Sequence, residues 1–241
     1  MSSIKIFIKF LFSKIVTLKF LERLSQNLIW RDILSRKKPK IVSTLKGSLK
    51  ISNEDLWNKS LRYKVWDRVP EYIDANKNIV YLEFGVWKGH SIKYFADKYK
   101  NKNSEFYGFD TFYGFPEKCL NMEKGHYSTD GEVPQVNDSR IKFIKGLFQE
   151  TLPDFLNKIQ FNPKDKIALI HFDAPLHTAT LFNLFKLSEK FGNYYFIFDQ
   201  LGTEECRALN NFSKSTLKDY DLYLASIWNS APEVVFGRFK T

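Results

Sequence analysis

Strands and helices alternate along most of this 241-residue chain, which limits its possible folds more than any other feature. Runs rich in β-branched and aromatic residues predict strands over residues 78–85, 104–110, 140–146, 166–173, 193–199, 221–228 and 233–239. Helical patterns cover residues 54–74 as far as the Pro70 region, and residues 89–99, 149–159, 177–190 and 203–217. Such alternation predicts an α/β fold with a doubly wound, mostly parallel seven-stranded sheet, closed by an antiparallel C-terminal hairpin.

Size and charge divide the chain into a basic arm and one α/β domain. The length suits a single core, and an apolar content of 44% excludes a disordered chain. The net charge of +10 lies wholly in residues 1–50, whereas residues 51–241 carry equal numbers of basic and acidic groups. We therefore assign residues 1–50 to a helical arm with its linker and residues 51–241 to the domain. The neutral domain predicts no nucleic-acid partner.

The arm is amphipathic, because apolar residues recur at helical spacing from Ile4 to Trp30 while lysines interrupt every apolar run. No stretch reaches the roughly 18 apolar residues of a membrane-spanning helix, and no signal-peptide cleavage site follows. Residues 1–35 could contact an anionic membrane surface, or they could pack on the domain or on a second copy in a homo-oligomer. Cys119 and Cys206 form no disulfide framework, which favours a cytoplasmic protein. If residues 1–35 contact a membrane surface, the protein is expected to be peripheral to that membrane.

Acidic residues end four of the first five predicted strands, namely Glu83, Asp110, Asp173 and Asp199. Ligands of doubly wound sheets bind at the carboxyl ends of the strands. A single acid could equally cap a helix or lie in a solvated loop. Four acids at matching positions indicate a binding site at this edge of the sheet.

The connection after the first domain strand suits a cationic nucleoside ligand. Gly85 permits a tight turn, Gly89 allows the backbone to approach a ligand where the next helix begins, and Ser91 can donate there. A carboxylate at Glu83 suits the ammonium group of an amino acid, whereas a pyrophosphate would gain nothing from it. Asp110, at the end of the next strand, suits ribose hydroxyls.

Four segments of the chain carry recognisable motifs in a fixed order. The first reads FYGFDTFYGFPE at residues 106–117, and the others lie at residues 124–131, 145–153 and 235–238. Together they resemble the motifs of macrocin O-methyltransferase-like enzymes, in which the first segment reads GFDTFxGxPE. The resemblance spans residues 78–239 and implies a class I fold, S-adenosylmethionine and methylation of a hydroxyl on a small-molecule or glycan acceptor. The implied cofactor-binding residues are Glu83, Phe84, Gly85, Gly89, Ser91, Asp110, Thr111, Phe112, Gly146, Phe148 and Asp173.

The resemblance also implies a magnesium site, in which acids after the fourth and fifth strands hold the ion. The family's segments Asp-x-Asp-x-Tyr and Asp-Asp here read DAPLH (173–177) and DQ (199–200). Asp173 and Asp199 are retained, and Gln200 offers an amide oxygen in place of the third carboxylate. We predict these three residues as Mg²⁺ ligands, in a site weaker than one with three carboxylates.

Methylation of a hydroxyl needs a group that removes its proton, and histidine titrates nearest to neutral pH. His126 lies in the long segment between the second and third domain strands, where a lid would lie. His177 begins the helix after Asp173. We predict His126 as the base, with His177 as the alternative and Asp173 beside the reaction, whereas His90 and His171 are expected to be structural.

These features predict an S-adenosylmethionine-dependent O-methyltransferase for a sugar or other polyhydroxyl acceptor, assisted by a divalent cation. Pro175 and Gln200, which replace acids of the family, favour the alternative of a non-catalytic methyltransferase-fold scaffold in glycan or surface-polymer synthesis. An NAD-dependent oxidoreductase is disfavoured, since the loop lacks GxGxxG and has Trp87 where a glycine is expected.

Overall fold

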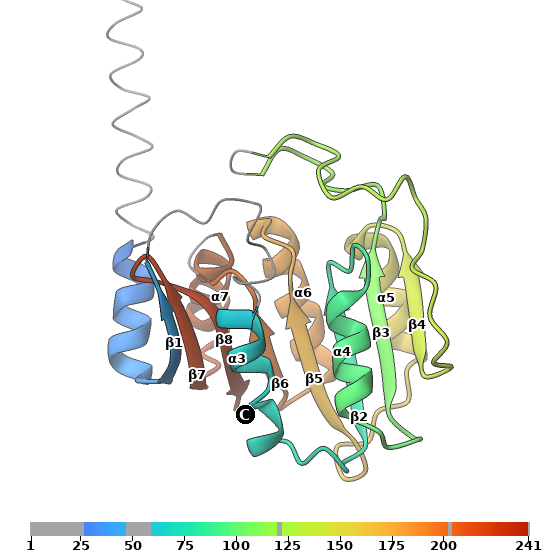
Figure 1. Cartoon of the computed structure of the whole chain (residues 1–241), viewed down its shortest axis with the longest axis horizontal. Coiled ribbons are helices and arrows are strands. Elements are labelled where there is room, and N and C mark those ends of the chain that lie inside the picture. Colours follow the sequence, from blue (N-terminus) through green and yellow to red (C-terminus); the bar gives the residue numbers. More distant parts are fainter. Residues whose placement is uncertain (1–26, 47–58, 120–121, 202–203, 241) are drawn as a thin grey trace, which may run out of the picture.

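A computed structural model describes residues 27–46, 59–119, 122–201 and 204–240, which form a helix-sheet-helix sandwich (Figure 1). The strands are β1 (Lys40–Leu45), β2 (Ile79–Phe84), β3 (Glu105–Asp110), β4 (Ile141–Lys145), β5 (Ile167–Phe172), β6 (Tyr195–Phe198), β7 (Tyr220–Trp228) and β8 (Ala231–Phe239). The helices are α3 (Arg62–Trp66), the 3-10 turn η2 (Val69–Glu71), α4 (His90–Lys98), α5 (Phe148–Lys158), α6 (His177–Lys190) and α7 (Glu204–Thr216).

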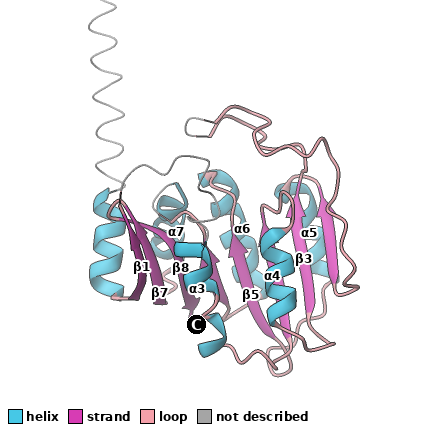
Figure 2. Cartoon of the chain, in the orientation of Figure 1, coloured by secondary structure: helices cyan, strands magenta, loops and turns pink. Residues whose placement is uncertain are grey.

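The sheet has the order β1-β7-β8-β6-β5-β2-β3-β4. Its pairs are parallel except where β8 runs antiparallel to β6 and to β7. This confirms the predicted mostly parallel α/β sheet with an antiparallel C-terminal hairpin. Helices cover both faces, with α3 and α4 on one side and α5, α6 and α7 on the other (Figure 2).

Within the described residues the sheet has eight strands and not the predicted seven. The additional strand is β1, at residues expected to belong to the linker, which pairs in parallel with β7 from Lys40–Leu224 to Leu45–Trp228. Half of β1 is exposed, as is usual for an edge strand, and Pro39 and a run of basic residues precede it. Its partner lies more than 170 positions later in the chain, so no local pattern reveals this pairing.

The described part of the arm packs on the domain. Residues 27–37 are helical, and Trp30 and Ile33 are buried in the core shared with α5, α6 and α7. No helix among the described residues is long and apolar enough to cross a membrane. Residues 1–26, to which the membrane interpretation also applies, lie outside the described part.

Side chains of the central strands alternate between the two faces and so position the site. On β2, Leu82 and Phe84 face α5 and α6, whereas Tyr81 lies in the core beneath α4. Phe84 stacks on Phe109 of β3 and Phe172 of β5, with ring centroids 5.0 and 5.9 Å apart, and Phe172 stacks on Phe198 of β6 at 4.5 Å. This row of rings fixes four adjacent strand ends in one register.

Candidate functional site

The strand-end residues meet at one edge of the sheet, because backbone hydrogen bonds continue the sheet one residue past the strands. The amide of Gly85 donates to the carbonyl of Phe109 at 3.0 Å, and the amide of Asp173 donates to that of Phe84 at 2.9 Å. The amide of Asp199 donates to the carbonyl of Phe172 at 3.1 Å. The predicted clustering of the strand ends is therefore observed.

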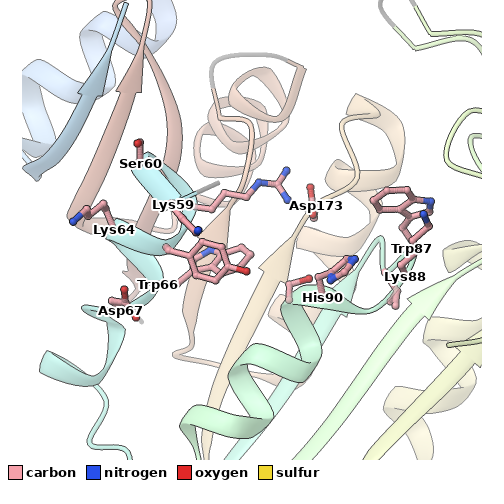
Figure 3. A pocket seen from close by; sticks show the side chains of 13 residues that line it. Lys59, Ser60, Lys64, Trp66, Asp67, Trp87, Lys88, His90 and Asp173 are labelled. Atoms are coloured by element: carbon pink, nitrogen blue, oxygen red, sulfur yellow. Dashed lines mark hydrogen bonds and ion pairs between the residues drawn. The ribbon is translucent and has the colours of Figure 1, made fainter. Parts of the chain in front are cut away.

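Two cavities open at this edge. The first has a volume of about 740 Å³ and is lined by Lys59, Ser60, Arg62, Tyr63, Lys64, Trp66, Asp67, Val86, Trp87, Lys88, His90, Ser91 and Asp173. In Figure 3, Asp173 lies between the α3 side of this cavity and the β2–α4 connection that carries Trp87 and Lys88. The second cavity, of about 480 Å³, lies above the carboxyl ends of β3 and β5.

The second cavity combines apolar and polar residues. It is lined by Arg62, Gly85, Val86, Trp87, Asp110, Thr111, Gly114, Phe115, Pro116, Glu117, Tyr127, Leu147, Phe148, Gln149, Glu150, Asp173, Ala174, Pro175, Leu176, Thr178, Ala179 and Gln200. The two cavities share Arg62, Val86, Trp87 and Asp173, so they meet beside these residues.

Asp110 shapes the wall of the second cavity. Its Oδ2 accepts hydrogen bonds from the amides of Val86 and Trp87 at 2.8 and 2.9 Å, and its Oδ1 accepts one from the amide of Phe112 at 2.8 Å. A carboxylate has about four lone-pair positions, so one acceptor position remains for a ligand. Asp110 thus fixes the β2–α4 connection and can still bind a hydroxyl group.

Gly85 is required where the β2–α4 connection passes the end of β5. Its φ of +92° is a conformation that side chains disfavour, and a Cβ atom there would lie 2.2 Å from the carbonyl oxygen of Asp173. The absent side chain allows the two backbones to approach and leaves the cavity open.

Glu83 is buried in a polar network under α4. Its carboxylate accepts hydrogen bonds from the Tyr81 hydroxyl at 2.5 Å and from Ser91 Oγ at 2.8 Å. Nδ1 of His171 lies 2.7 Å from the same Tyr81 hydroxyl. Burial raises the pKa of Glu83 to about 7, although His171 and the two hydroxyl groups favour its charged form.

His171 links this network to Asp199. Its Nε2 lies 3.2 Å from Asp199 Oδ2, and both side chains are fully buried. Burial alone lowers the pKa of His171, but the charges of Asp199 and Glu83 outweigh it, and the net shift is upward. The protonated ring can donate from both nitrogens, to Tyr81 and to Asp199.

Arg62 of α3 contacts the two other strand-end acids. Its Nη1 lies 3.4 Å from Oδ2 of Asp173 and 3.4 Å from Oδ2 of Asp199. Burial raises the pKa of Asp199, but Arg62 and His171 reverse the shift and hold it below its usual range. Burial also raises the pKa of Asp173, which Arg62 counteracts and the charge of Asp199 reinforces.

The structure brings about half of the predicted site residues to the cavities. The second cavity is lined by Gly85, Asp110, Thr111, Phe148, Asp173 and Gln200, and the first by Ser91 and Asp173. The remaining predicted cofactor and metal residues, which line neither cavity, are Glu83, Phe84, Gly89, Phe112, Gly146 and Asp199. Of these, Phe84 and Phe112 are core residues, and Glu83 and Asp199 belong to the buried network behind the cavities.

Neither histidine predicted as the base lines a cavity in the described structure. His126 is exposed, because its segment folds back on residues 112–115 and its ring packs 4.4 Å from that of Tyr127. His177 begins α6, and its Nε2 lies 3.2 Å from the Asn211 side chain of α7. Burial and Arg207 lower the pKa of His177. His90, expected to be structural, does line the first cavity.

Sequence reasoning missed Arg62 and Tyr127, which line the second cavity. Arg62 lies 111 positions before its partner Asp173, in a short helix without a recognisable motif. The available signal was the spacing of Arg62 and Trp66, since residues four apart share a helix face. Trp66 donates from Nε1 to Asp199 Oδ1 at 3.3 Å, beside the contact that Arg62 makes.

Comparison with known proteins agrees with this architecture. Residues 82–191 match the model of a methyltransferase domain family. A search of curated protein sequences finds no match for the chain. The O-methyltransferase NovP has a similar structure, with a TM-score of 0.52 and 17% identity over 71% of this chain and 75% of NovP.

A second solved structure, an O-methyltransferase from Bacillus cereus in complex with SAH, aligns with a TM-score of 0.46 and 12% identity, covering 73% of this chain and 79% of that one. At 17% identity, the likeness to NovP speaks for the fold alone. The chain thus carries a match to a methyltransferase domain over residues 82–191, within a mostly parallel Rossmann-like sheet.

Proposed function

We propose that the chain transfers a methyl group from S-adenosylmethionine to a hydroxyl of a sugar or another polyhydroxyl acceptor. The observation that carries the proposal is the pair of cavities that meet at Arg62, Val86, Trp87 and Asp173. One cavity suits a nucleoside and the other has a polar lining. Their junction is where a methyl donor and a hydroxyl would have to come together.

The second cavity fits the cofactor in size and in chemistry. Its volume of about 480 Å³ lies within the usual range for ligand sites. Leu147 and Phe148 offer apolar surface for adenine, and Asp110 offers an acceptor for ribose hydroxyls. Asp173 places a carboxylate where the cavities meet, as a cationic amino-acid group requires.

S-adenosylmethionine, when bound, supplies an electrophilic methyl group. The protein aligns the acceptor and removes its proton. Asp173 is the base in this proposal, because it lines both cavities, and a carboxylate oxygen would take the hydroxyl proton. Burial raises the pKa of Asp173, which favours proton uptake, while Arg62 opposes this shift and fixes the carboxylate.

The first cavity would hold the acceptor. Its lining carries the cationic residues Lys59, Lys64 and Lys88 together with hydroxyl groups and rings, a mixture that suits a sugar better than an apolar substrate. NovP, which shares the fold, is an O-methyltransferase. Both features support an oxygen acceptor with several polar groups.

The test is the transfer of labelled methyl groups from S-adenosylmethionine to monosaccharides, nucleotide sugars and oligosaccharides. We expect wild type to label at least one acceptor and Asp173→Asn to lower kcat by about 10²- to 10⁴-fold. Because Asp173 also faces the cationic amino-acid group of the cofactor, Asp173→Asn should bind S-adenosylhomocysteine more weakly but still measurably. Asp154→Asn, an exposed change on α5, is the matched control.

Two results would change this proposal. Activity retained in Asp173→Asn and lost in His126→Gln or His177→Gln would return that role to a histidine. Cofactor binding without transfer to any acceptor would instead favour the non-catalytic scaffold.

A further inference from the structure

The two strand-end acids expected to hold a divalent cation already contact a cation of the protein. Nη1 of Arg62 lies 3.4 Å from a carboxylate oxygen of each of Asp173 and Asp199. The Arg62 side chain is 19% exposed and that of Asp199 is fully buried, so the contact is largely shielded from water.

These acids are otherwise suited to a metal ion. His171, Asp173 and Asp199 each offer one ligand atom, and these atoms lie within 4.8 Å of one another. Mg²⁺ lies about 2.1 Å from its oxygen ligands, so an ion shared by both carboxylates would sit beside the Arg62 nitrogen. Its two positive charges would face a guanidinium that keeps its own charge at any physiological pH.

The charge balance of the cluster also disfavours a divalent ion. Arg62 offsets one of the two negative charges of Asp173 and Asp199, and the ring of His171, which can carry a second positive charge, lies 3.2 Å from the same Asp199 oxygen. Gln200, the predicted third ligand, adds a neutral amide and no charge. The residues present therefore do not fit the magnesium site that the resemblance implies.

The position of Arg62 is built into α3. Val65 and Trp66 anchor this helix in the core, and Trp66, one turn after Arg62, donates to the second oxygen of Asp199. Arg62 and Trp66 thus contact the same carboxylate from one helix face. Arg62 also lines both cavities.

We propose that Arg62 is a built-in cation that takes the place of the divalent metal, so that the site forms and binds its ligands without metal. Arg62 is a positioning residue in this scheme: its positive charge lies between Asp173 and Asp199, and it fixes Asp173 where the two cavities meet. The proposal concerns the cation site alone and stands independently of the acceptor.

The test is Mn²⁺ binding, followed by electron paramagnetic resonance and by the melting temperature of the full chain. We expect wild type to bind no Mn²⁺ at millimolar concentration, and its melting temperature to be the same with Mn²⁺ and with EDTA. Arg62→Ala releases both carboxylates, so it should bind Mn²⁺ and gain thermal stability from it. Arg62→Lys retains a cation and should not bind, and Arg62→Ala/Asp199→Asn should lose the acquired site.

Mn²⁺ binding by wild type that Asp199→Asn removes would overturn the proposal, as would a folded Arg62→Ala that binds no Mn²⁺. If Arg62→Ala does not fold, Mn²⁺ titration of wild type and of Asp199→Asn still shows whether the wild-type carboxylates bind the ion. None of these measurements uses the cofactor or methyl transfer. Failure of the proposed function would therefore be seen separately, as absent S-adenosylhomocysteine binding.

Discussion

Replacing Glu83 by glutamine should change how the stability of the protein depends on pH. Burial raises the pKa of Glu83 from 4.5 to about 7, so the folded protein holds this proton more tightly than the unfolded chain does. Between these two values, the unfolded state releases its proton while the folded state retains it. The free energy of unfolding must therefore fall as the pH rises through this window.

The size of the effect follows from the shift. A rise in the pKa of Glu83 from 4.5 to about 7 corresponds to about 3 kcal/mol of stability, at 1.36 kcal/mol per pKa unit. This contribution to the free energy of unfolding is lost once the pH exceeds the pKa of the folded state. Glutamine removes the charge and keeps an acceptor for Tyr81, which now donates to Glu83 at 2.5 Å. Glu83→Gln should match wild type near pH 4.5 and exceed its stability at pH 8 by up to about 3 kcal/mol.

Urea denaturation followed by circular dichroism at pH 5, 6, 7 and 8 measures this difference, with the exposed change Asp154→Asn as control. His171 also has a raised pKa, so part of the decline above neutral pH should persist in Glu83→Gln. Equal pH dependence of wild type and Glu83→Gln would refute the account of a buried, protonated carboxyl group.

Three further predictions concern packing and reactivity. Gly85→Ala should lower the free energy of unfolding in urea by about 3 kcal/mol or more, because strain at positive φ adds to overlap with the Asp173 carbonyl. Gly125→Ala, at a positive φ but with nothing within 4 Å, should lower it by only about 1 kcal/mol. Equal losses in the two variants would contradict the overlap. Ile33→Ala should lower the free energy of unfolding by about 2–5 kcal/mol, whereas the exposed Leu28→Ala should change it by less than about 0.5 kcal/mol; an unaffected Ile33→Ala would show that the arm does not pack. Burial raises the pKa of Cys119 to about 11 and that of Cys206 to about 12, so a thiol reagent at pH 8 should label both only after denaturation, and labelling of the native protein would contradict this.

The sequence predicted those parts of the fold that local patterns encode. Each predicted strand from residue 78 onward is present within about three residues of its expected ends, because buried strands are continuous apolar runs. The edge strand β1 was missed, since its pairing with β7 joins distant segments and its own residues are half exposed. The helix expected over residues 54–74 up to the Pro70 region is shorter in its described part, because α3 ends at Trp66 and the turn η2, which contains Pro70, follows it.

The candidate site also combines residues that local sequence patterns indicate with residues that only the fold brings together. Asp110, Asp173 and Asp199 lie at one edge, as predicted, because strand ends of a parallel sheet share that edge, and the first two line the second cavity. The chemistry around these acids depends on side chains that the fold brings in from elsewhere. Arg62 comes from a helix without a motif, and His126 is exposed in a loop that folds on itself and lines neither cavity.

The most direct test of the central claim is calorimetric titration of the full chain with S-adenosylhomocysteine, in EDTA and in Mg²⁺. The account predicts micromolar binding that is equal in both buffers, about tenfold or more weaker in Asp110→Asn and unchanged in Asp154→Asn. A melting curve should accompany Asp110→Asn, since Asp110 also holds the amides of Val86, Trp87 and Phe112. Wild-type protein that binds no S-adenosylhomocysteine in either buffer would contradict the assignment of the second cavity to the cofactor.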